Sequence, residues 1–182
     1  MRFATRLVFA LALCSAVPLS QAASAVFIPV QASAESGKVL IDIPGWNQPF
    51  VMVATLENAL GSNDIGLDRA ANGNPRLVEF RRVGAKAFLV QRNTAFVADS
   101  SDADEARAAQ DAFAESVLWA GPIQAGATAR VDITGLLTSD WVGVADRLEA
   151  TEQGGYRLDG ERSSIVPADA RSSPDNSDFT AL

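Results

Sequence analysis

The side chains that could do chemistry in this 182-residue chain are carboxylates and hydroxyls. The sequence contains no histidine, and its one cysteine, Cys14, lies in the apolar run near the N-terminus. Ser-His-Asp and Cys-His catalysis are therefore excluded, as are the imidazole and thiolate ligands that a catalytic zinc site uses. Paired carboxylates can hydrolyse glycosidic or peptide bonds only where they meet in a pocket that shifts their pKa values. Most acids between Asp102 and Glu115 fall on the wet face of one predicted helix, so we assign no catalytic residue.

A long polar loop over residues 61–75 carries the remaining candidate ligands. Its asparagines, aspartates and glycines stabilise turns through local hydrogen bonds or positive φ angles. One interpretation is an ordered surface loop closed by Asx turns. The other is a calcium site, because hard cations prefer amide and carboxylate oxygens. Its candidate ligands are Asn63, Asp64 and Asp68, although their spacing does not match an EF-hand loop.

Composition and charge narrow the class of protein. The chain is 48% hydrophobic and 20% charged, which is typical of one globular domain with a substantial core. The formal net charge is −7, so the basic face that nucleic-acid binding requires is not expected. No GxGxxG or GxxxxGK motif occurs, so nucleotide binding has no support.

The N-terminal stretch is typical of a secretory leader. Arg2 and Arg6 precede a short apolar run, and small residues at Ser20 and Ala22 fit a cleavage site. We expect a signal peptide over residues 1–22, with cleavage after Ala25 as the second choice. The mature chain would then be exported to the periplasm or the extracellular space, without a membrane association. It would also lack cysteine, so no disulfide could form.

The mature chain divides into a linker and one domain. Small residues over 23–37 predict a loosely held linker, and residues 38–182 predict a single domain. Residues 38–43 alternate as a half-buried strand does, whereas residues 50–56 are apolar throughout, which favours a strand covered on both faces. Residues 77–83 and 86–91 flank Gly84-Ala85 and predict a β-hairpin with a solvated charged face. Short strands are expected over 95–98 and 129–133.

Two helices complete the expected domain. Ser101 and the following acids predict a helix start, and the apolar spacing that continues through Phe113 and Val117 predicts that Phe113 anchors this helix on the sheet. Arg107 and Asp111 are expected to pair on its wet face, and a second helix is expected over residues 141–148. The predicted fold is α+β, with a mainly antiparallel sheet of six or so strands and one or two packed helices. The alternative is a β-sandwich with peripheral helices, and the expected core anchors are Phe50, Phe80, Phe113 and Trp119.

Several segments, in one order, resemble a known family. They are the loop over residues 61–69, the hairpin that begins at Arg76, the segment from Phe113 to Trp119, and residues 143–148. Together they are similar to the N-terminal domain of unknown function that precedes the peptidase domain in large secreted bacterial zinc-dependent metalloproteases of the HExxH type. The resemblance makes the loop a family signature, carried by Gly61, Ser62, Asn63, Asp64, Gly66, Asp68 and Arg69.

The resemblance implies an accessory function for this chain. In the family the HExxH motif lies in a separate domain downstream, so no zinc ligand is carried over, and zinc is expected only in the peptidase domain that this chain lacks. The expected partner is a peptidase domain of the same or a neighbouring polypeptide, which this domain would assist or shield as a propeptide does. Residues 178–182 begin to alternate as a strand does, and we expect either that the natural product continues or that a partner supplies the remainder. The alternative is a free-standing exported binding or inhibitor module.

Overall fold

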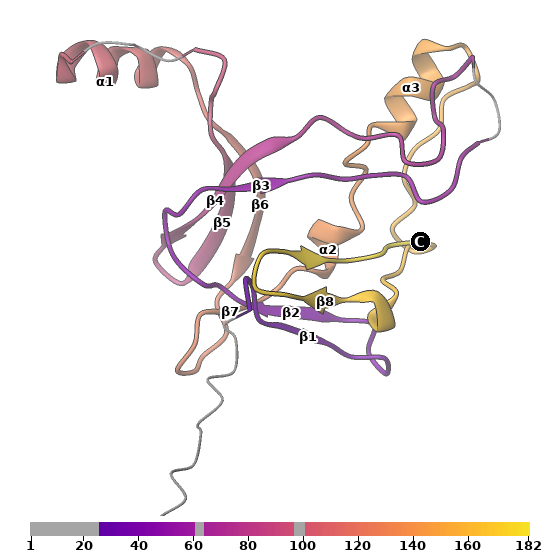
Figure 1. Ribbon diagram of the computed structural model, residues 1–182, viewed down its shortest axis with the longest axis horizontal. Helices are drawn as coiled ribbons and strands as arrows, with labels where there is room; N and C mark the ends of the chain where they lie inside the picture. The colour runs from indigo at the N-terminus through magenta and orange to yellow at the C-terminus, as the bar shows by residue number, and fades with distance from the viewer. Residues whose placement is uncertain (1–25, 61–63, 97–100) are drawn as a thin grey trace, which may run out of the picture.

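A computed structural model describes residues 26–60, 64–96 and 101–182 (Figure 1). The predicted signal peptide lies outside these residues, as do Gly61, Ser62 and Asn63 of the polar loop. Within the described residues no helix is both long enough and apolar enough to cross a membrane.

Mainly antiparallel strands in three sheets, with a few short helices, make up the described fold, which agrees with the predicted α+β class. The three-stranded sheet has the order β1-β2-β7, the four-stranded sheet β3-β4-β5-β6, and the small sheet β8-β9. The strands are β1 (Val30–Ala32), β2 (Val39–Asp42), β3 (Phe50–Met52), β4 (Arg76–Val83), β5 (Lys86–Gln91), β6 (Ser116–Pro122), β7 (Arg130–Asp132), β8 (Arg171–Ser172) and β9 (Ser177–Asp178). The helices are α1 (Ala103–Ala112), α2 (Thr134–Leu137) and α3 (Val144–Ala150), with a 3-10 turn at Pro167–Asp169.

The predicted hairpin is the centre of the larger sheet. β4 and β5 pair antiparallel from Val78 opposite Gln91 to Val83 opposite Lys86. Gly84 begins the connecting turn at φ 58°, a backbone region that glycine enters without a steric penalty. The inward alternation of β4 and β5 places Val78, Phe80, Ala87 and Leu89 in the core.

One core lies between the two larger sheets. Val39, Ile41 and Val131 from the three-stranded sheet pack with Val78, Phe80 and Leu89 from the four-stranded sheet. Each of these side chains is at most 3% exposed. The single six-stranded sheet of our prediction is therefore wrong in its arrangement, because the strands divide between sheets that close on a shared interior. Residues 26–32, predicted to be a linker, join this core through Ile28 and pair with β2 through β1.

The predicted helix around Glu105 forms, but it does not pack on the sheet. α1 begins after Asp102, whose carboxylate accepts a hydrogen bond from the Asp104 amide at 2.8 Å. The helix ends at Ala112, before Phe113, and projects from the end of the four-stranded sheet (Figure 1). Phe113 is 38% exposed and stacks on Phe96 with ring centroids 4.1 Å apart, so its predicted role as a core anchor is wrong.

The residues that follow α1 form a strand where helical spacing was expected. Val117 and Trp119 belong to β6, which pairs with β5 across a bulge at Leu89/Val90. Arg107 pairs with Asp104 at 3.5 Å, in the preceding turn, and not with Asp111. Ala95 and Phe96 form a bend whose two amides donate to the Asn93 side chain, and the rest of the predicted strand at 95–98 lies outside the described residues.

Candidate functional site: an apolar groove beside β3

The β3 segment, defined here as β3 together with residues 53–56, which continue it, forms one wall of the candidate site. Its even-numbered residues face the core side, where the Phe50 ring lies 5.6 Å from Phe80 and 5.8 Å from Phe27. Its odd-numbered side chains are exposed, with Val51 at 64% and Val53 at 48%. The prediction that this stretch is covered on both faces is therefore wrong, because no element among the described residues covers the face that carries Val51 and Val53.

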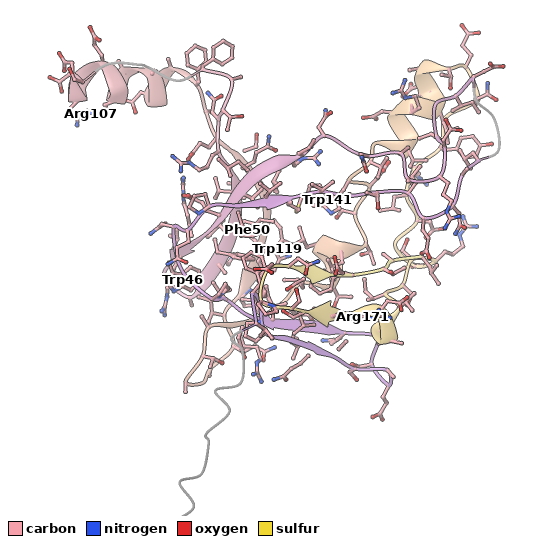
Figure 2. The ribbon with its side chains drawn as sticks, viewed as in Figure 1. Trp46, Phe50, Arg107, Trp119, Trp141 and Arg171 are labelled. Atoms are coloured by element: carbon pink, nitrogen blue, oxygen red, sulfur yellow. The ribbon has the colours of Figure 1, made fainter. Side chains whose placement is uncertain are left out.

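Trp141, labelled in Figure 2, also lines the groove. Its indole Nε1 donates to the Leu136 carbonyl at 2.6 Å, which ties the ring to α2. The Arg76 guanidinium lies 5.3 Å from the centre of the Trp141 ring, within cation–π range, and Nη1 of the same side chain donates to the Trp141 carbonyl at 3.4 Å. Half-buried Trp141 is therefore held in place from both sides.

Gly73 lets the polar loop pack against this wall. The Gly73 amide donates to the Ala54 carbonyl at 2.9 Å, so the loop runs beside the β3 segment. A Cβ at position 73 would lie 2.7 Å from the Trp141 carbonyl oxygen, closer than real Cβ atoms approach. Only glycine fits this contact between the loop and the groove wall.

The third side of the groove comes from the N- and C-terminal segments. The Phe27 amide donates to the Ser173 carbonyl at 2.7 Å, and Ile165 pairs with Ala181 in an antiparallel bridge. Phe179 is half-buried and packs against the core cluster at this end. Residues 178–182 therefore lie alongside Ile165, while their outer side faces the groove.

A cavity of about 1350 Å³ lies between these walls, open to solvent. Its volume exceeds the upper end of the roughly 300–1,000 Å³ range typical of small-molecule pockets. The apolar side chains that line it include Phe27, Phe50, Met52, Val53, Leu136, Leu137, Trp141, Val144, Leu148 and Phe179.

Asp140 shapes the border of the groove at the start of α3. Its carboxylate accepts hydrogen bonds from the backbone amides of Gly143, Val144 and Ala145, all at 2.9 Å. The second helix, expected over residues 141–148, starts at Val144 and not at Trp141. Gly143 precedes α3 at φ 78°, which turns the chain between Trp141 and the helix.

An ionic cluster covers the outer face of the four-stranded sheet. Glu79 is 5% exposed and accepts from Arg81 Nε at 2.6 Å, while the Arg81 guanidinium also binds both oxygens of Glu115 at 2.5 and 2.9 Å. The hydrogen bonds from Arg81 hold the pKa of Glu115 below its usual value. The predicted solvated face is therefore wrong for Glu79, because the long arginine side chains bury it.

Two further carboxylates are held ionised near the strand ends. The Arg130 guanidinium binds both oxygens of Asp42 at 2.8 and 2.9 Å and lowers the pKa of that carboxyl. Burial opposes ionisation of Asp132, but hydrogen bonds from Thr134 and the ammonium of Lys38 lower its pKa overall. Carboxylates held ionised by paired cations stabilise the fold and are unsuited to act as general acids.

The polar loop is described from Asp64 onward. Asp64 and Asp68 are exposed, Gly66 adopts φ 70°, and Leu67 is buried at 3% and so anchors the loop. Asn63, the third candidate calcium ligand, lies outside the described residues, as do Gly61 and Ser62. Within the described ranges no group of three or more metal-ligating side chains gathers. The calcium interpretation stays a prediction.

Three of the four predicted anchors lie in or against the core. Phe80 is 3% exposed, and Phe50 and Trp119 are half-buried against the core cluster, at the centre of the molecule in Figure 2. The sequence reasoning did not identify the groove. The uninterrupted apolar run at residues 50–56 was the sequence feature that could have indicated the groove, because apolar side chains on both faces of a strand expose one face wherever no element covers it.

The fold and the groove together define a mainly antiparallel domain with an open apolar binding surface and no assembled catalytic group among its described residues. Residues 70–182 match the model of a family described as a domain of unknown function, DUF5117, and the chain belongs to that family. No curated protein and no solved structure matches the chain.

Proposed function

We propose that this chain is a non-catalytic N-terminal accessory domain of an exported bacterial zinc-dependent metalloprotease. It binds the peptidase domain of the same or a neighbouring polypeptide and assists or shields it as a propeptide does. The observation that carries the proposal is the open apolar groove, in which exposed Val51 and Val53 lie beside a cavity of about 1350 Å³, larger than typical small-molecule pockets. An unpartnered apolar surface of this kind marks a protein interaction site.

The composition and the family support the same function. The sequence has no histidine, and its one cysteine lies in the predicted leader, so the hydrolytic chemistry has to come from the partner. The DUF5117 match covers the hairpin, the groove wall at Trp141 and the C-terminal segment. The resemblance to the N-terminal regions of zinc-dependent metalloproteases supports, by analogy, a peptidase domain with an HExxH motif as the partner.

The test uses the HExxH peptidase domain encoded in the same or a neighbouring reading frame, produced as a separate polypeptide. Calorimetric titration with the mature chain should give a dissociation constant of about 1 µM or tighter, as a specific interface would. Val53→Glu places a charge in the groove and should weaken binding roughly tenfold or more. Val83→Glu is the matched control, because Val83 is 65% exposed at the hairpin end of β4 and outside the groove.

Peptidase assays separate the proposed function from its alternatives. Activity should belong to the peptidase domain, should be lost with a zinc chelator and should be absent from this chain alone. The domain should raise the yield of active peptidase when the two fold together. Inhibition without any effect on folding would instead identify an inhibitor module. Absence of any HExxH coding sequence nearby, or equal binding by Val53→Glu and wild type, would contradict the proposal.

A further inference from the structure

The β3 segment presents a row of backbone groups that the fold leaves unpaired. The Leu77 carbonyl of β4 accepts a hydrogen bond from the Arg92 amide at 2.9 Å, so the backbone groups of Leu77 point toward β5. Val51 lies opposite Leu77 in the pairing of β3 with β4. The amide and carbonyl of Val51 therefore point away from β4. Ala54 and Leu56 bond inward, to Gly73 and to Ala70 and Ala71. The backbone groups of Val51, Val53 and Thr55 therefore form an open strand edge, without a hydrogen-bond partner among the described residues.

This open edge borders the groove. Val51, Val53 and Thr55 all line the cavity, together with Trp141 and Phe179 from other segments of the chain. A strand added along this edge would direct every second side chain into the apolar cavity and would place the residues between them beside Val51 and Val53. Another extended backbone matches amides and carbonyls that repeat at a spacing of two residues, which is how a peptide adds to an exposed sheet edge.

The charges around the groove define the partner further. Its lining carries four carboxylates, from Asp140, Asp159, Asp175 and Asp178, against the two guanidinium groups of Arg157 and Arg162. Arg162 is also paired with Asp159 at 2.7 Å. The chain as a whole has a formal net charge of −7, so a second copy would be repelled and a segment with basic residues would be attracted.

We infer that the β3 edge binds an extended segment of the partner polypeptide as an added strand. The segment has apolar residues at alternate positions and lysine or arginine at its ends. The inference rests on the proposed function, because it takes the groove to be the surface that a partner polypeptide occupies. It adds the binding mode, in which main-chain hydrogen bonds supply affinity and the cavity selects the side chains.

The test uses the mature chain and a synthetic nonapeptide of alternating valine and threonine with a lysine at each end. Hydrogen exchange followed by NMR should show the amides of Val51, Val53 and Thr55 exchanging rapidly in the free protein and protected about tenfold or more with saturating peptide. A second peptide has the same sequence but is N-methylated at every second residue along one edge. Because it lacks those donors, it should bind at least about tenfold more weakly.

A variant of the protein removes a main-chain hydrogen bond that the protein, and not the peptide, donates. Val53→Pro deletes one outward amide, and proline is tolerated at an edge position whose N–H faces away from the sheet. We expect an unchanged circular dichroism spectrum and peptide affinity about fivefold to tenfold weaker. Val53→Thr is the matched control, since it keeps the amide, the β-branched shape and wild-type affinity. The hydrogen-exchange measurement on wild type needs no variant, so it decides the inference even if Val53→Pro fails to fold.

Three results would overturn strand addition. They are unprotected amides at Val51 and Val53 with peptide bound, equal affinity for the methylated and unmethylated peptides, and a wild-type dimer in light scattering that Val53→Pro dissociates. The last result would assign the edge to a second copy. Titration with the peptidase domain reports separately on the proposed function, because that domain could bind the groove through side chains even where the nonapeptide does not bind.

Discussion

β3 and β6 are the two edges of the same four-stranded sheet, yet only β6 carries features that block further pairing. Pro122 ends β6, a bulge interrupts its pairing with β5, and the Arg81–Glu115 ion pair lies at its start. The chain then continues to Gln124, whose amide donates to the Arg130 carbonyl and joins the neighbouring sheet. By contrast, residues 51–55 contain neither a charge nor a proline.

This difference supports the proposal that the β3 edge binds a partner. Natural proteins protect edge strands with charges, prolines and bulges, because an open edge promotes uncontrolled pairing. An apolar, unprotected edge beside a large groove is therefore a liability unless another polypeptide covers it. The contrast predicts that changes at β6 affect stability, while changes at β3 affect binding.

The largest expected effect comes from Trp119 on the protected edge. Its half-buried ring packs against the core and covers Gly121, whose Cβ position would lie 2.7 Å from ring atom Cη2. Trp119→Ala should lower the free energy of unfolding by roughly 3 kcal/mol, as truncation of a large core aromatic does. Urea denaturation of the mature chain measures this loss. Val51→Ala on the open edge is the comparison and should cost less than about 0.5 kcal/mol; equal losses at the two edges would remove the contrast.

Arg81 on the outer face should give the next largest effect. Arg81→Ala leaves the buried Glu79 carboxylate with only Arg92, whose Nε lies 4.0 Å away. Breaking a buried pair costs about 3–5 kcal/mol, and the one-third exposure of Arg81 reduces our expectation to about 2 kcal/mol. Urea denaturation at neutral pH measures the loss. Arg107→Ala is the control, because it removes an exposed ion pair within α1 and should change the free energy of unfolding by less than about 0.5 kcal/mol. A loss as large as that of Arg81→Ala would contradict the conclusion that burial strengthens the Glu79–Arg81 pair.

The smallest effect should appear on acidification. The pKa of Glu115 is lowered in the folded chain, so the unfolded chain binds more protons in the range between the folded value and the ordinary value near 4.5. The stability that ionised Glu115 contributes to the folded chain is complete above the ordinary pKa of glutamate and is lost as the pH falls through the lowered pKa of the folded chain. Between about pH 6 and pH 3 the wild type should therefore lose up to about 1 kcal/mol more than Glu115→Gln. Parallel pH profiles of unfolding free energy for the two chains would contradict this assignment.

Local sequence patterns predicted the hairpin, the strand at β2 and the start of α1, because each depends on neighbouring residues. The alternation through Val39 and Ile41 and the turn at Gly84 require no distant contact. The end of α1 could not be predicted in the same way. Helical spacing continues through Phe113 and Val117, but pairing of β6 with β5 holds Val117 in a strand, and this pairing joins residues that are distant in the sequence.

The groove could not be predicted, for a related reason. The apolar run at residues 50–56 is compatible with a covered central strand or with an open edge, and only the position of β3 in the strand order distinguishes them. Burial of Glu79 could not be predicted because one of its two arginine partners, Arg81, lies on β4 and the other, Arg92, follows β5. Both properties depend on which elements become neighbours, and the local pattern of either segment does not contain that information.

The attachment of Trp141 gives the protein an intrinsic optical reporter. Its indole is fixed by the Leu136 carbonyl and the Arg76 guanidinium, and it lines the groove, whereas Trp46 and Trp119 do not. An occupant that excludes water from this wall would shift the fluorescence emission of Trp141 to shorter wavelength. With Trp46 and Trp119 each replaced by phenylalanine, the remaining fluorescence would follow occupancy of the groove in real time, without a chemical label.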